Sequence, residues 1–475
     1  MVTTSKQNAW AQAIAKPATE FDRTPLSIIS GAIPTNLRGT LYRNGPARLS
    51  RGGERVGHWF DGDGAILGVH FKDDGATGVY RYVQTQGYLD EQEKDTFIYP
   101  NYGMTAKGAF WNNWFKPVKN AANTSVLALP DRLLALWEGG KPHSLDLETL
   151  ATSGIDDLIG LTDKQPFSAH PKVDGVTGEI FNYGVSAGAS TILNLYRCDR
   201  FGKLQHHNTH TLSGLPMIHD FCLAGRYMVF LVSPVRVNLT PILLGQKSYS
   251  EAMEWKPELG TEVLIFDRNS LSLVSRGNSD PWFQWHFSNG CVNSSGNIVT
   301  EFIRYDNFDT NQYLKEIASG YTQTTAEGTL WELTIDPQTA KVINNKQLCE
   351  LQGEFSLVAP QDVGKPWRYT YLNVHRHNVP TKRELYQAIA RFDRQTHKIA
   401  IVDMGENCYS SEPILVTDKN NSEGWLLNVV YDGNSDRSEV RIYQSDLATD
   451  VPICRLALPS VIPHGFHGTW KDVRY

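Results

Sequence analysis

Apolar and polar positions alternate along this chain in short runs. In residues 69–82 (VHFKDDGATGVYRY), two apolar runs flank a turn rich in Asp and Gly. An apolar run, a polar turn and a second apolar run together predict a β-hairpin. The same pattern recurs in five further places, at residues 193–205, 263–274, 330–342, 390–402 and 441–458.

From residue 193 onward, these hairpins begin roughly 50 to 70 residues apart, an interval typical of propeller blades. A β-propeller leaves only short, protected edge strands and gathers side chains from distant blades in a central channel. We therefore predict an all-β propeller. Two stacked β-sandwich domains remain the alternative. No linker or low-complexity tract divides the chain, so we expect one domain over residues 1–475, with an N-terminal extension over residues 1–30 that is partly flexible.

Helix is scarce in the pattern. The best candidates are residues 381–388 and pieces of 309–320. We therefore expect loops and short helices to form a dome over one face of the propeller and to shape any pocket there.

Composition narrows the choice of partner. The chain has 475 residues, of which 41% are hydrophobic and 11% aromatic, enough for a large core. Its formal net charge is -6, and no lysine or arginine cluster follows one face. Because nucleic-acid binding requires such a basic footprint, we expect no nucleic-acid partner.

The N-terminal sequence MVTTSKQNAWAQAIAKP has no basic stretch followed by an apolar one, and no later window could span a bilayer. We therefore expect a cytoplasmic protein. The six cysteines are scattered without a CxxC pair, which indicates reduced, buried thiols.

The chain has fourteen histidines, and most have ordinary interpretations. His58, in GHWFDGDG, fits a tight turn, and six others stand beside polar or turn residues and suit the surface: His206, His207, His210, His375, His377 and His397. Four more have distinctive contexts and are separated by 49, 67 and 181 residues, so only the fold could bring them together. They are His170 (FSAHPKVD), His219 (PMIHDF), His286 (WFQWHFSNG) and His467 (HGFHGTW). Taken singly, each would more often be a satisfied core histidine.

Several stretches together resemble the carotenoid cleavage oxygenases. These are GTLYRNGP at residues 39–46, HWFDGDG at 58–64, LLALWEGGKPH at 133–143 and the four histidine contexts, all in the family's order. The likeness is greatest to the cyanobacterial apocarotenoid oxygenases, and it implies a seven-bladed propeller. It also implies that His170, His219, His286 and His467 are ligands of an Fe(II) cofactor. Imidazole donors alone would also suit zinc or copper.

Four neutral imidazoles leave the charge of a ferrous ion to be balanced by carboxylates that accept hydrogen bonds from the outer imidazole N–H groups. The resemblance assigns this role to Glu138 in LWEGG, Glu354 in QGEFS and Glu412 in SSEPI. For any one of them, a solvated surface charge is the ordinary alternative. In relatives, proline often stands where this chain has Ser356. Thr124, in ANTSV, matches a threonine whose methyl group borders a vacant iron position.

The resemblance implies a dioxygenase that uses O2 to cleave a C=C bond of an apocarotenoid or carotenoid, with central cleavage to retinal-type products as our expectation. The protein would hold a long apolar polyene with one double bond over the iron. Stilbene-cleaving relatives have a lysine just before the LWEGG-type glutamate. This chain has Trp137 there, which favours the polyene.

A polyene partitions into membranes, so we expect peripheral membrane contact. Two segments combine apolar side chains with nearby Lys or Arg, residues 235–245 (VRVNLTPILLG) and 110–118 (FWNNWFKPV). The alternative is that loops cover these segments.

Two other functions stay open at this stage. A non-catalytic propeller could bind a carotenoid or a partner and use the histidines structurally. A zinc hydrolase would need a ligand set with a base at hand, and no such motif stands out.

Overall fold

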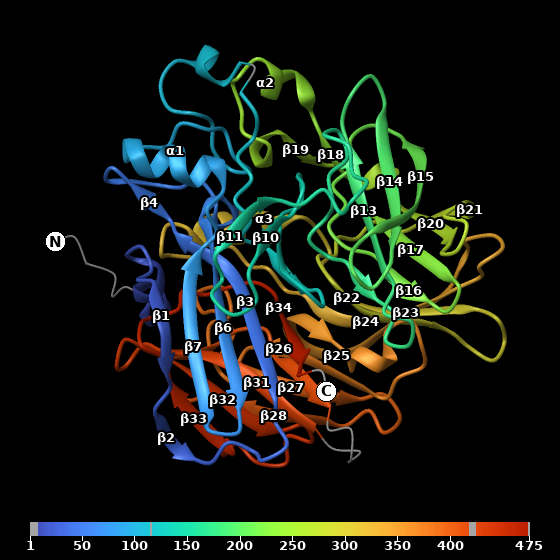
Figure 1. Ribbon diagram of the computed structural model, residues 1–475. Coiled ribbons are helices and arrows are strands. Elements are labelled where there is room, and N and C mark those ends of the chain that lie inside the picture. Colours follow the sequence, from blue (N-terminus) through green and yellow to red (C-terminus); the bar gives the residue numbers. More distant parts are fainter. Residues whose placement is uncertain (1–7, 115, 418–423, 474–475) are drawn as a thin grey trace.

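The computed structural model describes residues 8–114, 116–417 and 424–473. Its strands form six large sheets arranged around a centre, with α1 (Gln86–Lys94) and α2 (Leu239–Leu243) at one end of the molecule (Figure 1). The largest sheet has seven strands and is divided by one long strand, β25 (Val342–Leu357). β25 pairs with one neighbour up to Gln352 and with the next from Gly353, so it belongs to two blades. The six sheets thus make seven blades, the number that the family resemblance implied.

The blades follow one another in chain order. Blade 2 consists of β8 (Ser125–Ala128), β9 (Leu133–Leu136), β10 (His143–Leu145) and β11 (Thr152–Ile155). Blade 3 consists of β12 (Lys172–Val173), β13 (Ile180–Ser186), β14 (Thr191–Cys198) and β15 (Leu204–Leu212). Blade 4 consists of β16 (Cys222–Ala224), β17 (Tyr227–Val232), β20 (Thr261–Asp267) and β21 (Leu273–Ser279). Blade 5 consists of β22 (Phe287–Val292), β23 (Ile298–Arg304), β24 (Thr329–Ile335) and the first part of β25, and blade 6 of the end of β25, β26 (Tyr369–Val374), β27 (Ala388–Asp393) and β28 (Ile399–Asp403).

Blades 1 and 7 close the ring by combining strands from opposite ends of the chain. In blade 1 the late strand β34 pairs with the early strand β3, so that red and blue arrows lie side by side in Figure 1. In blade 7 the early strand β2 pairs with β33. Blade 1 consists of β1 (Phe21–Pro25), β7 (Gly75–Tyr82), β6 (Asp63–Lys72), β3 (Gly39–Arg48) and β34 (Gly468–Asp472). Blade 7 consists of β2 (Ile28–Gly31), β33 (Cys454–Ala457), β32 (Arg437–Gln444), β31 (Gly424–Asp432), β29 (Cys408–Ser410) and β30 (Ile414–Thr417).

The core is divided between the blade junctions. Each pair of neighbouring blades has its own buried apolar cluster. At the closing junction, for example, Leu67 and Val69 of blade 1 pack with Leu427 and Ile442 of blade 7, all with no exposed surface. Alternate residues of each strand face the two neighbouring blades, so both faces of a strand are buried. This packing explains the apolar runs from which the hairpins were predicted.

All six predicted hairpins are present. The helix predicted within 309–320 is confirmed as α3 (Asp309–Ile317), whereas the one predicted at 381–388 is wrong. There residues 381–383 form a turn and residues 384–387 lead into β27, because Tyr386 accepts a backbone hydrogen bond from Ser410 and Gln387 one from Met404. Contacts with the next segment of the chain override local helix propensity at this place.

Residues expected as an N-terminal extension are built into the ring. From Ala9 onward they form a 3₁₀ turn (Ala9–Ile14) with a fully buried Trp10, followed by β1 and β2 of the two closing blades. Residues 1–7 lie outside the described part of the chain, and the division of the chain into domains stays a prediction.

Loops and short elements cover one end of the ring. They include two small ribbons, β4 (Ser50–Arg51) with β5 (Glu54–Arg55) and β18 (Val235–Val237) with β19 (Met253–Trp255). The other short helical elements of the described residues are 3₁₀ turns, at Trp59–Asp61, Phe110–Asn113, Ser250–Ala252, Pro257–Leu259 and Pro360–Asp362. His58 caps the first of these and accepts a hydrogen bond from the Phe60 amide, which confirms its place in a tight turn.

Candidate metal centre

The four distinctive histidines stand just before edge strands of four blades. His170 lies two residues before β12, His219 three before β16, His286 directly before β22 and His467 directly before β34. Edge strands of consecutive blades meet at the propeller axis, so residues far apart in sequence arrive at one place.

The other three blades each place a predicted site residue at the corresponding position. Thr124 comes directly before β8, Glu354 lies in β25 where blade 6 begins, and Glu412 lies between β29 and β30. Glu138 follows β9 in blade 2. The structure thus brings all eight predicted residues to the same end of the ring.

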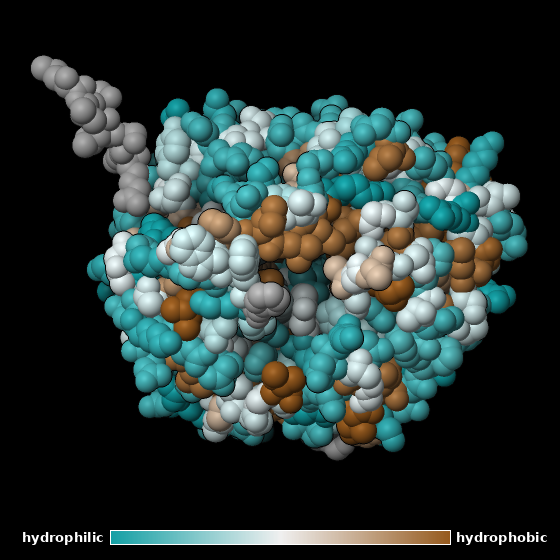
Figure 2. Space-filling model, turned by 90° about the horizontal axis from the view of Figure 1, so that it is seen from above, coloured by the Kyte–Doolittle hydropathy of each residue, from teal (hydrophilic) through white to brown (hydrophobic). Residues whose placement is uncertain are grey.

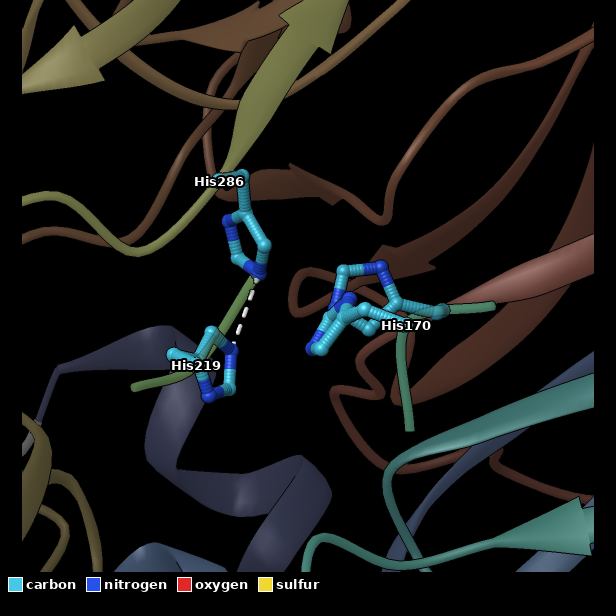
Figure 3. A group of neighbouring side chains, drawn as sticks. His170, His219 and His286 are labelled. Atoms are coloured by element: carbon cyan, nitrogen blue, oxygen red, sulfur yellow. Dashed lines mark hydrogen bonds between the residues drawn. The ribbon is translucent and has the colours of Figure 1, made fainter. Parts of the chain in front are cut away.

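The four imidazoles converge. One nitrogen from each lies within 4.8 Å of the others, and Nε2 of His219 is 3.3 Å from Nε2 of His286 (Figure 3). With a metal–nitrogen length of about 2.0–2.1 Å, neighbouring ligands at right angles would be about 3 Å apart and opposite ligands about 4 Å apart. All four residues are at most 9% exposed, and Nε2 of His170 has no hydrogen-bond partner among the described residues. This donor set fits a single transition-metal ion.

Burial favours the neutral form of three of the four rings. Burial, with the neighbouring imidazoles, lowers the pKa of His170 and His219 well below the usual range. Burial also lowers the pKa of His467. At His286 burial acts in the same direction, but the Glu354 carboxylate outweighs it and raises the pKa. Neutral imidazole is the form that offers a lone pair to a metal.

Two carboxylates hold the outer nitrogens of two rings. Glu412 Oε1 accepts from Nδ1 of His467 at 2.9 Å, and Glu354 Oε2 bonds Nδ1 of His286. Glu412 and Glu354 are 8% and 5% exposed, so neither is a solvated surface charge. These bonds direct Nε2 of both rings toward the cluster.

Glu138 is placed differently. Its Oε1 lies 3.2 Å from Nε2 of His170 and 3.3 Å from Nδ1 of His219, but neither pair is aligned as a hydrogen bond. The Glu138 side chain is 29% exposed, and its exposed part faces an internal cavity. Burial, together with the Asp220 carboxylate, therefore raises its pKa well above the usual range.

Two residues that the sequence did not single out support these carboxylates. Arg43 donates to Glu412 Oε2 at 3.1 Å and to the carbonyls of Glu412 and Phe466, both at 2.9 Å. Burial raises the pKa of Glu412, but His467 and Arg43 outweigh it and lower the pKa. Tyr305 donates to Glu354 Oε1 at 3.1 Å. In the sequence, the only feature that pointed to Arg43 was its place in the motif GTLYRNGP.

A cavity of about 410 Å³ reaches the cluster. His219, His286, His467 and Thr124 line it, and its other walls are mostly apolar, including Trp137, Met217, Trp285, Phe355 and Phe466. The histidines that the sequence assigned to ordinary roles, such as His206 and His397, are not part of the cluster.

Known proteins agree with this arrangement. The family model described as retinal pigment epithelial membrane protein (RPE65) matches residues 14–472. The chain is 34% identical to apocarotenoid-15,15'-oxygenase of Synechocystis, over 94% of this chain and 92% of that protein. It is 25% identical to resveratrol cleavage oxygenase 1 of Aspergillus fumigatus, over 94% and 92% of the two chains. The crystal structure of cobalt-substituted Synechocystis ACO superposes with a TM-score of 0.89 at 32% identity and covers 98% of both chains. This chain therefore belongs to the RPE65 family, whose members include apocarotenoid and carotenoid cleavage oxygenases.

Proposed function

We propose that this protein is a non-haem Fe(II) dioxygenase that cleaves one C=C bond of an apocarotenoid or carotenoid. The observation that carries the proposal is the convergence of four buried imidazoles beside an apolar cavity. The similar apocarotenoid oxygenase supplies the substrate class, and central cleavage to retinal-type products is our choice of bond.

We assign the metal to His170, His219, His286 and His467. Glu354 and Glu412 orient two of these rings, Glu138 lies beside the other two, and Thr124 lines the cavity next to them. A ferrous ion held here would activate O2, so that both oxygen atoms join the alkene carbons and two carbonyl products form without an external reductant.

The chain's own residues hold the polyene and keep water out. The cavity volume is in the range usual for small-molecule sites. Its aromatic walls suit a long conjugated hydrocarbon better than a polar, hydrated ligand. Trp137 lies in this wall at the position where stilbene-cleaving relatives carry lysine. The wall therefore lacks the cation that would help to activate a phenol.

Incubation of the purified iron-loaded protein with an apocarotenal in detergent under air tests the proposal. We expect two carbonyl products, each with one atom from ¹⁸O2, and one iron per chain. Resveratrol and isoeugenol, offered separately, should be turned over at least about tenfold more slowly. No product and no bound iron would favour a non-catalytic binding protein, while faster resveratrol cleavage would make the protein a stilbene-cleaving enzyme.

We also propose that this enzyme is cytoplasmic and docks on a membrane surface to collect its apolar substrate. Within the described residues, no helix is long and apolar enough to cross a bilayer. Apolar side chains gather on the face seen in Figure 2, beside a hollow. We define the apolar rim as Phe110, Trp111, Leu243 and Leu244, which are 47%, 58%, 72% and 44% exposed.

The two segments of the rim lie together. Trp114 donates its indole N–H to the Leu244 carbonyl at 3.2 Å, and Val118 links this region to the cavity wall. Lys116 and Lys247 are exposed nearby, as suits an anionic surface. Only the α2 end of the predicted segment 235–245 is exposed, because β18 is largely buried, and residue 115 of the other segment lies outside the described residues.

Replacing Trp111 and Leu243 together by serine should weaken binding to anionic phospholipid vesicles by about tenfold or more, since each buried apolar side chain contributes about 1.5–3 kcal/mol. Cosedimentation measures the effect. The matched control is Ile159→Ser with Val176→Ser, at two residues that are 67% and 76% exposed and outside the rim. Equal loss in both double variants would show that the rim is no special docking surface.

A further inference from the structure

A carboxylate that touches none of the four imidazoles connects the segments that carry three of them. Asp220 follows His219 directly, and its side chain is 1% exposed. Its Oδ1 lies 2.7 Å from Nζ of Lys172 and accepts from the Phe221 amide at 2.8 Å. Its Oδ2 accepts from the Phe287 amide at 2.9 Å.

Each partner of Asp220 belongs to a different blade. Lys172 opens β12 two residues after His170, and Phe287 opens β22 directly after His286. One carboxylate therefore joins the starts of three edge strands, in blades 3, 4 and 5, at the point where their histidines leave the strands.

The three edge strands lie in three different sheets, so no backbone ladder among the described strands joins one of them to another. Each of the three is the edge strand of its own blade, and its backbone pairs with the next strand of that blade. A charge-assisted bond to Lys172 and a bond to a backbone amide are both short and directional. Asp220 thus connects the three ligand-bearing segments directly.

The Asp220–Lys172 pair borders a second cavity beside the histidines. A second cavity of about 180 Å³ lies against the histidines and is lined by His170, His286 and His467 together with Lys172 and Asp220. His286 and His467 also line the large apolar cavity. The cluster therefore has an apolar substrate side and a second side on which Asp220 and Lys172 meet.

We propose that Asp220, paired with Lys172, is a positioning unit that holds His170, His219 and His286 at the spacing that a metal ion requires. This inference rests on the proposed metal site and adds two residues to it. Neither residue would contact the ion. They act through the backbone of the strands, whereas Glu354 and Glu412 act on the imidazole rings themselves.

Asp220→Asn tests the unit, because it keeps the shape of the side chain and removes its charge. Titration of the metal-free protein with Co(II), followed by visible absorption and competed with a chelator, should give a dissociation constant about 10–100-fold higher than in the unchanged protein. Lys172→Met should weaken Co(II) binding in the same direction, and Lys172→Arg, which keeps the cation, should restore affinity to within about threefold.

Asp267→Asn is the matched control. Asp267 pairs with Arg226 in the same blade as Asp220, but at the far end of β17 and β20 from the histidines. The Asp267→Asn protein should bind Co(II) with the affinity of the unchanged protein. Circular dichroism checks that each variant is folded, and Lys172→Met covers the case in which Asp220→Asn fails to fold.

Unchanged Co(II) affinity in both folded variants, Asp220→Asn and Lys172→Met, would overturn the inference. If the unchanged protein itself bound no Co(II), the proposed metal site would be wrong instead, so the two failures are distinguishable.

Discussion

His286→Ala and His467→Ala are each expected to leave the purified protein with little or no iron and no measurable cleavage activity. Each substitution removes a donor from a set of four and leaves a gap in a buried site. Loss of a residue that merely orients a ligand typically costs 10–100-fold in metal affinity or activity, so loss of the ligand itself should cost considerably more. Metal analysis and product formation from an apocarotenal measure the two effects.

His397→Ala is the control for these variants. His397 is exposed and lies outside the cluster, so its loss should leave iron content and activity as they are. A His286→Ala protein that kept one iron per chain and normal turnover would refute the four-histidine assignment.

Glu412→Ala should produce the second-largest effect, because it damages both stability and the metal site. The carboxylate accepts from His467, Arg43 and the Gly468 amide at 2.9, 3.1 and 2.8 Å. Removing it leaves the buried Arg43 guanidinium without its counter-charge, which typically costs about 3–5 kcal/mol. It also frees the His467 ring. We expect a lower free energy of unfolding in urea for the metal-free protein and weaker Co(II) binding in the folded one.

The double variant Arg43→Met with Glu412→Ala separates the two effects. Without the unpaired charge, much of the lost stability should return, whereas Co(II) affinity should stay low because His467 still lacks its partner. Glu148→Ala, at a half-exposed glutamate paired with Arg23, should change stability by less than about 1 kcal/mol. Recovery of Co(II) affinity in the double variant would mean that Glu412 acts only on stability.

The sequence predicted local structure well, because each hairpin is encoded by neighbouring residues. Ring closure could not be predicted in the same way, because it joins residues far apart in the sequence. β34 pairs with β3 across more than 400 residues, and no local pattern marks either strand as the other's partner. The helix predicted at 381–388 failed for the same reason, since contacts made by Tyr386 and Gln387 with a later segment decide its conformation.

The candidate site was predicted from resemblance and then placed by the fold. Spacing alone would not have joined His286 to His467, because 181 residues separate them. Arg43 was missed because its partner Glu412 lies 369 residues later. Asp220 was missed because an aspartate next to a histidine has no distinctive pattern, and its role is visible only where blades 3, 4 and 5 meet.

The pairing of β34 with β3 also has a consequence for biosynthesis. The last donor, His467, is carried by the strand that seals the circle, so a growing polypeptide on the ribosome can present at most three of the four donors until that strand docks. The complete set of four donors therefore forms only late in folding. Until then the site lacks both its fourth donor and the closed ring that surrounds it.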